Sequence, residues 1–189
     1  MADLFNLAFR YVVLNEGEQS NHPTDRGGLT RWGITEYQAK NHRCLEHPEG
    51  IDVRKVDLAL AKHIYLEDYW EFSGIKSPQV AVKLFDYGVN FGVRTAVKLA
   101  QETVNSMGKA KLTVDGILGK LSADAINAID PQRFLDQLEI HADDRYWSII
   151  YNSLVARFGK KEVDKTQAVF GRGWFRRSNK RFYIAEGDL

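Results

Sequence analysis

Residues 15–35 decide how this chain folds, and they read NEGEQSNHPTDRGGLTRWGIT. They follow an apolar run, residues 4–14, whose spacing favours a single helix. One face of that helix carries Phe5, Phe9, Val12 or Val13, and Glu16. The pattern therefore places a carboxylate at the end of an apolar face, next to Gly17, which can stop the helix.

A carboxyl group in mostly apolar surroundings disfavours its charged form, so its pKa rises. Such a group can serve as a general acid near neutral pH, which is the chemistry that Glu16 suggests. A second carboxylate, Asp25, follows, and Gly27-Gly28 suit a tight, hairpin-like turn. Residues 29–35 alternate loosely and predict a short strand edge.

From Glu16 onward the stretch has the pattern E-G-x-x-S-N-x-P-x-D-x-G-G-x-T-x-x-G-I-T. This pattern closely resembles the opening motif of glycoside hydrolase family 108. Members of that family are N-acetylmuramidases of phage and bacterial origin, related to secretion-activator proteins, with a lysozyme-like helical fold. The family usually reads E-G-G-Y-S-N, whereas Glu18 and Gln19 stand here in place of the second Gly and the Tyr. The loop after Glu16 therefore lacks an aromatic ring that could touch sugar.

The resemblance implies catalytic roles for Glu16, Asp25 and Thr30, in the Glu, Asp, Thr order of phage-type lysozymes. Glu16 is the expected acid, and the second requirement is a nucleophile, a base or a positioned water. The residues that we expect to contact substrate are Trp32, Thr35, Tyr37 and Asn90. Trp32 and Tyr37 offer flat faces to sugar rings, although aromatic side chains more often belong to the core.

Asn90 enters through the segment DYGVNFG, residues 86–92, which resembles the D-x-x-V-N-x-G of the same family. The resemblance places Asn90 beside the cleft, whereas the residues alone equally suit a polar cap at a helix end. A further segment, residues 113–126, resembles the D-G-x-x-G-x-x-[ST]-x-x-A-[IL] signature of peptidoglycan-binding helical modules. In it, Asp115-Gly116 predicts a turn and Ser122 predicts a helix cap.

Local signals predict the remaining helices. Asp57 is suited to cap a helix through Trp70, and Ser77-Pro78 is a typical helix start. Residues 95–107 fit another helix, closed by a glycine. The longest periodic segment runs from Asp130-Pro131 to Phe158, and a helix of ~28 residues is ~42 Å long. We expect it to be a spine for both halves. Thr35 with Gln38 has the pattern of a capping box, and His141 is expected to be structural.

Composition narrows the possible functions. The chain has 189 residues, of which 44% are hydrophobic and 27% are charged, as in ordinary globular proteins. A formal net charge of +1 argues against a dedicated nucleic-acid binder. Basic residues cluster within 172–181 and suit either a solvated face or attraction to an anionic polymer such as the cell wall.

Neither a cofactor nor a metal is expected. Cys44 is the only cysteine, so an intramolecular disulfide is impossible and a Cys-based metal site cannot form from it alone. His42 and His47 read as loop histidines and not as ligands. No secretory signal and no apolar run of ~18 residues is visible. We therefore expect synthesis in the bacterial cytoplasm without membrane insertion, and action on the cell wall or periplasm after release by a holin or a secretion system.

The predicted fold is mostly α, a lysozyme-like helical fold with a small β-hairpin or loop after the first helix. Residues 1–92 form a muramidase-like lobe, and residues 93–189 form a helical, peptidoglycan-binding-like lobe packed against it as one body. The predicted activity is hydrolysis of the β-1,4 bond between N-acetylmuramic acid and N-acetylglucosamine in peptidoglycan glycan strands. The alternatives are a lytic transglycosylase and a non-catalytic wall-binding or secretion-helper protein.

Overall fold

The structure is a computed structural model that describes residues 2–16, 19–20, 29–43 and 47–158. Its α-helices are α1 (Ala2–Glu16), α2 (Glu36–Asn41), α3 (Leu58–Asp68), α4 (Pro78–Phe91), α5 (Val93–Ser106), α6 (Lys120–Asn127) and α7 (Pro131–Phe158). Two 3-10 turns are η1 (Val53–Lys55) and η2 (Phe72–Gly74), and the strands are β1 (Gln19–Ser20), β2 (Thr30–Arg31) and β3 (Ile34–Thr35). The fold is thus mostly α and lysozyme-like with a small sheet after the first helix, as predicted.

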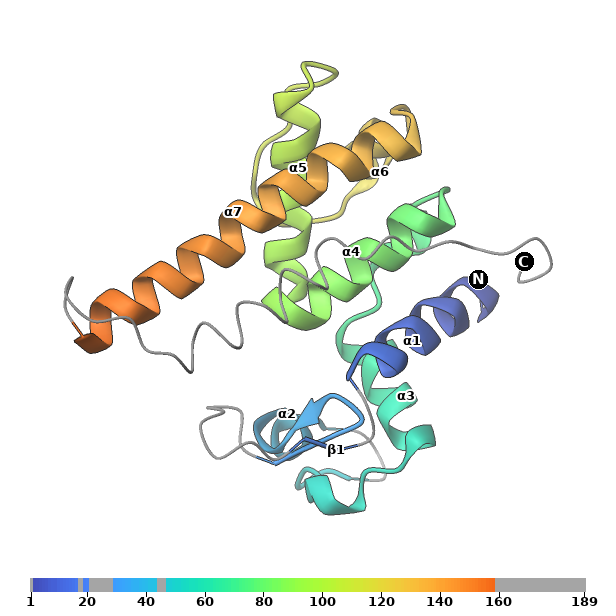
Figure 1. Ribbon diagram of the computed structural model, residues 1–189. Helices are drawn as coiled ribbons and strands as arrows, with labels where there is room; N and C mark the ends of the chain where they lie inside the picture. Colours follow the sequence, from blue (N-terminus) through green and yellow to red (C-terminus); the bar gives the residue numbers. More distant parts are fainter. Residues whose placement is uncertain (1, 17–18, 21–28, 44–46, 159–189) are drawn as a thin grey trace.

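Helix α4 is the centre of the molecule. Residues 80–88 are all buried, because α4 contacts α1 and η2 on one side and α5 and α7 on the other. Figure 1 shows α4 between α1 and the pair formed by α5 and α7. The helix begins where the sequence predicts, since the Ser77 Oγ accepts a hydrogen bond from the Val80 amide at 3.4 Å and Pro78 occupies the first turn.

Aromatic side chains fasten α1 to this central helix. The Phe5 ring lies 6.1 Å from that of Phe85 and 5.4 Å from that of Trp70, both edge to face. Phe9 packs on Tyr65 of α3 at 5.7 Å. Each buried aromatic side chain contributes about 1.5–3 kcal/mol through the apolar surface it removes from water. The predicted apolar face of the first helix is therefore confirmed at Phe5, Phe9 and Val12, which are all buried.

The sheet after α1 differs in detail from the single strand edge predicted for residues 29–35. It has three strands in the order β1-β2-β3, all antiparallel. Between β2 and β3 the chain reverses at Trp32 and Gly33, whose φ angles are 54° and 79°. Two positive φ angles in a two-residue loop match the twist of paired strands. The segment is therefore a tight hairpin with its turn at Trp32–Gly33. The sequence analysis placed the turn at Gly27-Gly28, which lie outside the described residues, and missed this one because Trp rarely adopts such a conformation.

Most predicted helix ends are confirmed, with small shifts. The Asp57 Oδ1 accepts from the Leu60 amide at 2.8 Å, but α3 ends at Asp68 and not at Trp70. Helix α5 starts two residues earlier than predicted and ends one residue earlier. Helix α7 spans Pro131–Phe158, and the Arg133 amide donates to the Asp130 Oδ1 at 3.0 Å. No helix in the part of the chain that the structure describes is long and apolar enough to cross a membrane.

The long α7 packs through one stripe of its surface. Phe134, Leu138, Ala142 and Tyr146 are buried, and the Tyr146 ring lies 4.5 Å from that of Phe91 at the end of α4. The His141 Nε2 lies 3.2 Å from the Ser106 Oγ of α5, which agrees with a structural histidine.

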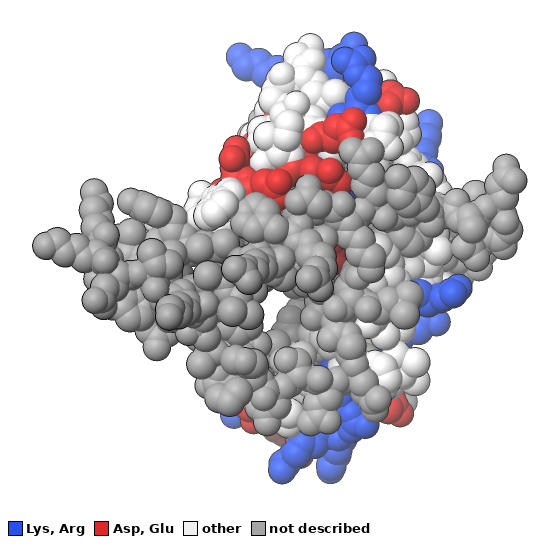
Figure 2. Space-filling model, viewed as in Figure 1, with Lys and Arg blue, Asp and Glu red and all other residues white. Residues whose placement is uncertain are grey.

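Figure 2 shows Asp and Glu side chains in a band across the upper half of the viewed face. An anionic polymer would be repelled there.

The segment resembling a wall-binding signature is organised by one buried amide. The Gln101 side chain of α5 is 1% exposed, and its Nε2 donates to the Asp115 Oδ1 at 2.8 Å and to the Ser122 Oγ at 3.2 Å. The Gly116 amide donates back to the Gln101 Oε1 at 2.9 Å. The predicted Ser122 cap is wrong: α6 begins at Lys120 after Gly119, and Ser122 is buried inside the helix, where Gln101 reaches it.

Gly116 is expected to be essential for this loop. Its φ is +78°, and an added Cβ would lie 2.5 Å from the Arg94 Cγ and 2.7 Å from the Arg94 carbonyl oxygen. Gly108 has a similar φ of +65° with nothing within 4 Å, so it is a matched control. We predict that Gly108→Ala lowers the free energy of unfolding by about 1–2 kcal/mol. Gly116→Ala should cost at least about 1 kcal/mol more, through overpacking. Equal losses in urea denaturation would contradict the predicted clash.

Asp115 makes this loop sensitive to acid. The hydrogen bond from the Gln101 side chain, helped by that from the Ile117 amide, holds the pKa of Asp115 below its usual value of 3.8. A pKa that is lower in the folded state means that stabilisation is present above about pH 3.8 and is lost as the pH falls through the folded-state value. Wild-type protein should therefore be more stable than Asp115→Asn at pH 6, and the difference should shrink below pH 3.8. A difference independent of pH, measured by urea denaturation, would contradict this assignment.

Candidate functional site

The predicted catalytic acid, Glu16, is the last residue of α1. Phe5, Phe9 and Val12 form the buried face that holds α1 against the core, and the helix ends at Glu16. The Glu16 side chain and the whole of Asp25 lie outside what the structure describes, so their roles stay predictions. What the structure does describe is the scaffold on either side of this pair.

The sheet returns the chain to the end of α1. Ser20 of β1, four residues after Glu16, pairs with Thr30 of β2, and Thr30 pairs in turn with Thr35 of β3. Antiparallel partners lie about 4.5–5.5 Å apart between Cα atoms. Thr30 is half-buried. The predicted catalytic threonine is therefore held beside the segment that leaves Glu16.

Two polar contacts hold the hairpin to the helical body. The Tyr65 hydroxyl of α3 donates to the Trp32 carbonyl oxygen at 3.3 Å. The Arg31 guanidinium donates to the Arg54 carbonyl oxygen in η1 at 2.5 Å. Ile34 of β3 is fully buried. The hairpin is thus fixed by polar contacts at β2 and at its turn, and by burial at β3.

The predicted sugar-stacking aromatics have different environments. Trp32 is half-buried and packs against the core, and its Nε1 is buried without a hydrogen-bond partner among the described residues. Tyr37, on the first turn of α2, is 75% exposed. An exposed ring keeps its face available to a ligand, whereas a packed ring contributes mainly to the core. Of the two, Tyr37 has the ring that a ligand can reach.

Thr35 has a structural task that was predicted from the sequence. Its Oγ1 accepts from the Gln38 amide at 3.2 Å, and the Gln38 Oε1 accepts from the Thr35 amide at 2.7 Å. The predicted capping box is therefore confirmed. The predicted contact of Thr35 with substrate stays a prediction. Its hydroxyl oxygen accepts the capping bond and keeps its proton to donate.

Asn90 lies in the last turn of α4, half-buried, and its Nδ2 donates to the Asp86 carbonyl oxygen at 2.6 Å. One turn earlier is a charge pair that the sequence analysis did not single out. The Lys83 Nζ lies 4.0 Å from the Asp86 Oδ2, and both side chains are buried. The signal was available, since two charges three residues apart interrupt an apolar helix. Asp86 and Lys83 lie about one and two turns before Asn90 along α4.

A groove formed by described residues lies elsewhere. It measures about 600 Å³, and its lining includes Phe5 of α1, Lys62 and Leu66 of α3, and Trp70, which follows α3. A smaller hollow of about 270 Å³ lies between α2 and η1, with Glu36, Lys40 and Arg54 on its walls. Neither holds any of the seven predicted site residues.

Residues 9–92 match the family model of glycosyl hydrolase 108. The matched segment begins within α1, ends at Gly92 after α4, and contains all seven predicted site residues. No curated protein matches the chain.

A solved structure of similar fold is that of Brucella abortus SagA. It is 23% identical, and the match covers 95% of this chain and 98% of that one, with a TM-score of 0.64. At this identity the likeness concerns the fold. It extends through α5, α6 and α7, beyond the segment that matches glycosyl hydrolase 108.

Replacing Thr35 tests the capping box directly. Thr35→Ala removes the oxygen that accepts from the Gln38 amide and should lower the free energy of unfolding by about 1 kcal/mol. Thr35→Ser keeps that oxygen and should be close to wild type in urea denaturation. If Ser proved as destabilising as Ala, the hydroxyl would not be the group that stabilises the start of α2.

Proposed function

We propose that this protein is a peptidoglycan hydrolase of the glycosyl hydrolase 108 family. The observation that carries the proposal is the match of residues 9–92, the segment that contains Glu16, Asp25 and Thr30. The finer proposal is an N-acetylmuramidase, which cuts the β-1,4 bond between N-acetylmuramic acid and N-acetylglucosamine. Its substrate is the glycan strand of the cell wall, which the enzyme reaches after release through a holin or a secretion system.

The proposed chemistry starts with a proton. Glu16 protonates the glycosidic oxygen, which lets the leaving sugar depart while positive charge develops at the neighbouring carbon. Asp25 then acts either as a base that activates water or as a nucleophile, and Thr30 orients the water. Carboxyl groups ~6.5–9.5 Å apart favour inversion, whereas ~5–5.5 Å favours retention.

The scaffold suits this chemistry in two ways. The aromatic contacts of α1 with α4 and α3 fix the helix whose last residue is Glu16. The pairing of Ser20 with Thr30 brings the hairpin back to that helix end. A general acid works best when its position relative to the second group is fixed before substrate binds. In this proposal residues 1–92 cut the glycan and residues 93–189 bind the wall.

A second candidate is a non-catalytic wall-binding or secretion-helper protein. Glu18 and Gln19, which depart from the family motif, favour it. The 113–126 signature favours it less, because Gln101 and Gly116 account for that signature as a structural device. A lytic transglycosylase would use the same acid but would yield anhydro-muramyl ends.

Substitution of the acid tests the proposal. Glu16→Gln keeps the shape of the side chain but cannot donate the proton, so release of reducing ends from purified peptidoglycan should fall at least about 100-fold. Glu102→Gln makes the same chemical change at an exposed position of α5 and should retain wild-type activity. Thermal melting of both variants checks the fold.

The outcomes separate the candidates. Full activity of Glu16→Gln would place the acid elsewhere and overturn the proposed mechanism. Wild-type protein that sediments with sacculi but releases neither reducing nor anhydro ends would favour the wall-binding alternative.

A further inference from the structure

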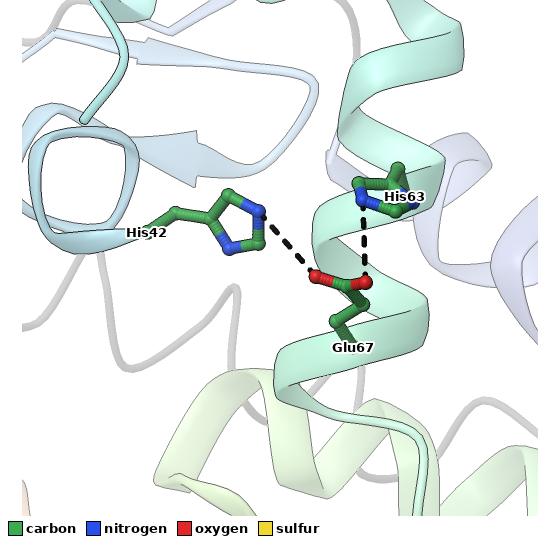
Figure 3. Close-up of side chains that lie close together, drawn as sticks. All are labelled: His42, His63 and Glu67. Atoms are coloured by element: carbon green, nitrogen blue, oxygen red, sulfur yellow. Dashed lines mark ion pairs between the residues drawn. The ribbon is translucent and has the colours of Figure 1, made fainter. Parts of the chain in front are cut away.

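Two histidines and two carboxylates meet where α2 ends against α3. His42 is the residue that follows α2, while His63 and Glu67 lie one turn apart on the same face of α3. Figure 3 shows the three side chains converging, with Glu67 between the imidazoles. One ligand atom from each lies within 4.8 Å of the others. None of the three is among the predicted catalytic residues.

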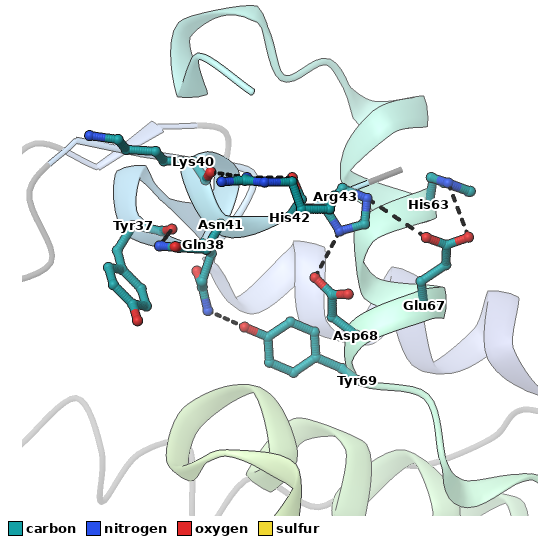
Figure 4. Close-up of polar contacts among 10 residues, drawn as sticks. All are labelled: Tyr37, Gln38, Lys40, Asn41, His42, Arg43, His63, Glu67, Asp68 and Tyr69. Carbon is teal, nitrogen blue, oxygen red and sulfur yellow. Dashed lines mark hydrogen bonds and ion pairs between the residues drawn. The ribbon is translucent and has the colours of Figure 1, made fainter. Parts of the chain in front are cut away.

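The orientation of His42 is fixed by a carboxylate behind it. The His42 Nδ1 lies 2.9 Å from the Asp68 Oδ2, and a carboxylate can only accept, so Nδ1 carries the proton (Figure 4). The His42 side chain is only 1% exposed. In neutral His42 this leaves Nε2 with its lone pair pointing away from Asp68. A carboxylate that holds the remote nitrogen in this way is typical of metal-binding histidines.

The other nitrogen of His42 has no hydrogen-bond partner among the described residues, although a Glu67 oxygen lies within ion-pair distance. Its Nε2 is buried and makes no hydrogen bond within the described residues. It faces the Glu67 Oε2 at 3.7 Å. A lone pair and a carboxylate facing each other at this distance repel, and a cation between them removes the repulsion.

The spacing of the cluster fits a small, tetrahedral cation. Bonds of about 2.0–2.2 Å around tetrahedral zinc place ligand atoms roughly 3.3–3.5 Å apart. The His63 Nε2 lies 3.3 Å from one Glu67 oxygen, Oε1, and the His42 Nε2 lies 3.7 Å from the other, Oε2. One ligand atom from each of the three residues lies within 4.8 Å of the others, so the cluster would tighten slightly around an ion. The His63 and Glu67 side chains are 45% and 46% exposed, so both can adjust and a water can complete the coordination.

We propose that His42, His63 and Glu67 bind Zn²⁺, with Asp68 orienting His42 from behind. Two imidazoles and one carboxylate are a ligand set that suits Zn²⁺. The ion would tie the chain after α2 to α3, beside the bond that Gln38 donates to the Tyr69 hydroxyl (Figure 4). The site is independent of the proposed glycosidase chemistry, since it shares no residue with it.

Metal titration tests the site. The full-length chain, without a polyhistidine tag and with Cys44→Ser so that its thiol cannot contribute, is titrated with ZnCl₂ against a chromophoric chelator. We expect stoichiometric binding. His63→Ala and Glu67→Gln remove exposed ligands without opening the core and should abolish it, whereas His47→Ala, a histidine outside the cluster, should not change it. Asp68→Asn should weaken binding by about 10–100-fold.

Two further readouts distinguish a built site from surface association. Zn²⁺ should raise the melting temperature of the parent protein but not that of His63→Ala or Glu67→Gln. Co²⁺ in place of Zn²⁺ should give the visible absorption bands of tetrahedral coordination. Absence of stoichiometric binding, or equal binding by the parent and both ligand variants, would overturn the proposal and leave the cluster as an ion-pair network. Neither result would bear on the Glu16 test.

Discussion

The packing of α1 against the buried α4 is the constraint on which the rest of this structure depends. Residues 80–88 of α4 are buried, and the rings of Phe5, Tyr65 and Trp70 pack edge to face on the ring of Phe85. Because Phe5 belongs to α1, this contact fixes the helix that ends at Glu16. It also joins the elements before α4 to α5 and α7 after it.

Polar contacts also fix the positions of the hairpin and α2. Tyr65 holds the Trp32 carbonyl, Gln38 bonds Tyr69, and Asp68 orients His42. Burial raises the pKa of Tyr69, so its hydroxyl keeps its proton. All three contacts involve α3 or the residue that follows it. Helix α3 therefore positions the small sheet relative to α1. The proposed zinc ion would add to the same connection.

Local signals in the sequence predict much of this fold. Contacts between residues far apart in the sequence leave no such signal. Ser77-Pro78 and Asp130-Pro131 mark helix starts to the residue, because a cap and a proline act within one turn. The Trp32–Gly33 turn was missed because a positive φ at Trp has no local signal. Ser122 became a buried hydrogen-bond partner and not a cap because Gln101, 21 residues away, reaches it. His42 read as a loop histidine for the same reason, since its partners lie in α3. For the site, the sheet pairs Thr30 with Thr35, while the side chain of Glu16 and the whole of Asp25 lie outside the described residues, so the predicted site roles stay predictions.

In the proposed reaction, water attacks a glycosidic bond that is protonated from the end of α1. The decisive measurement is mass spectrometry of the soluble fragments released from purified peptidoglycan by the wild-type protein. Water attack should yield muropeptides that end in reducing N-acetylmuramic acid. Fragments one water lighter would identify a transglycosylase, and the absence of new fragments would contradict a wall-cutting enzyme altogether.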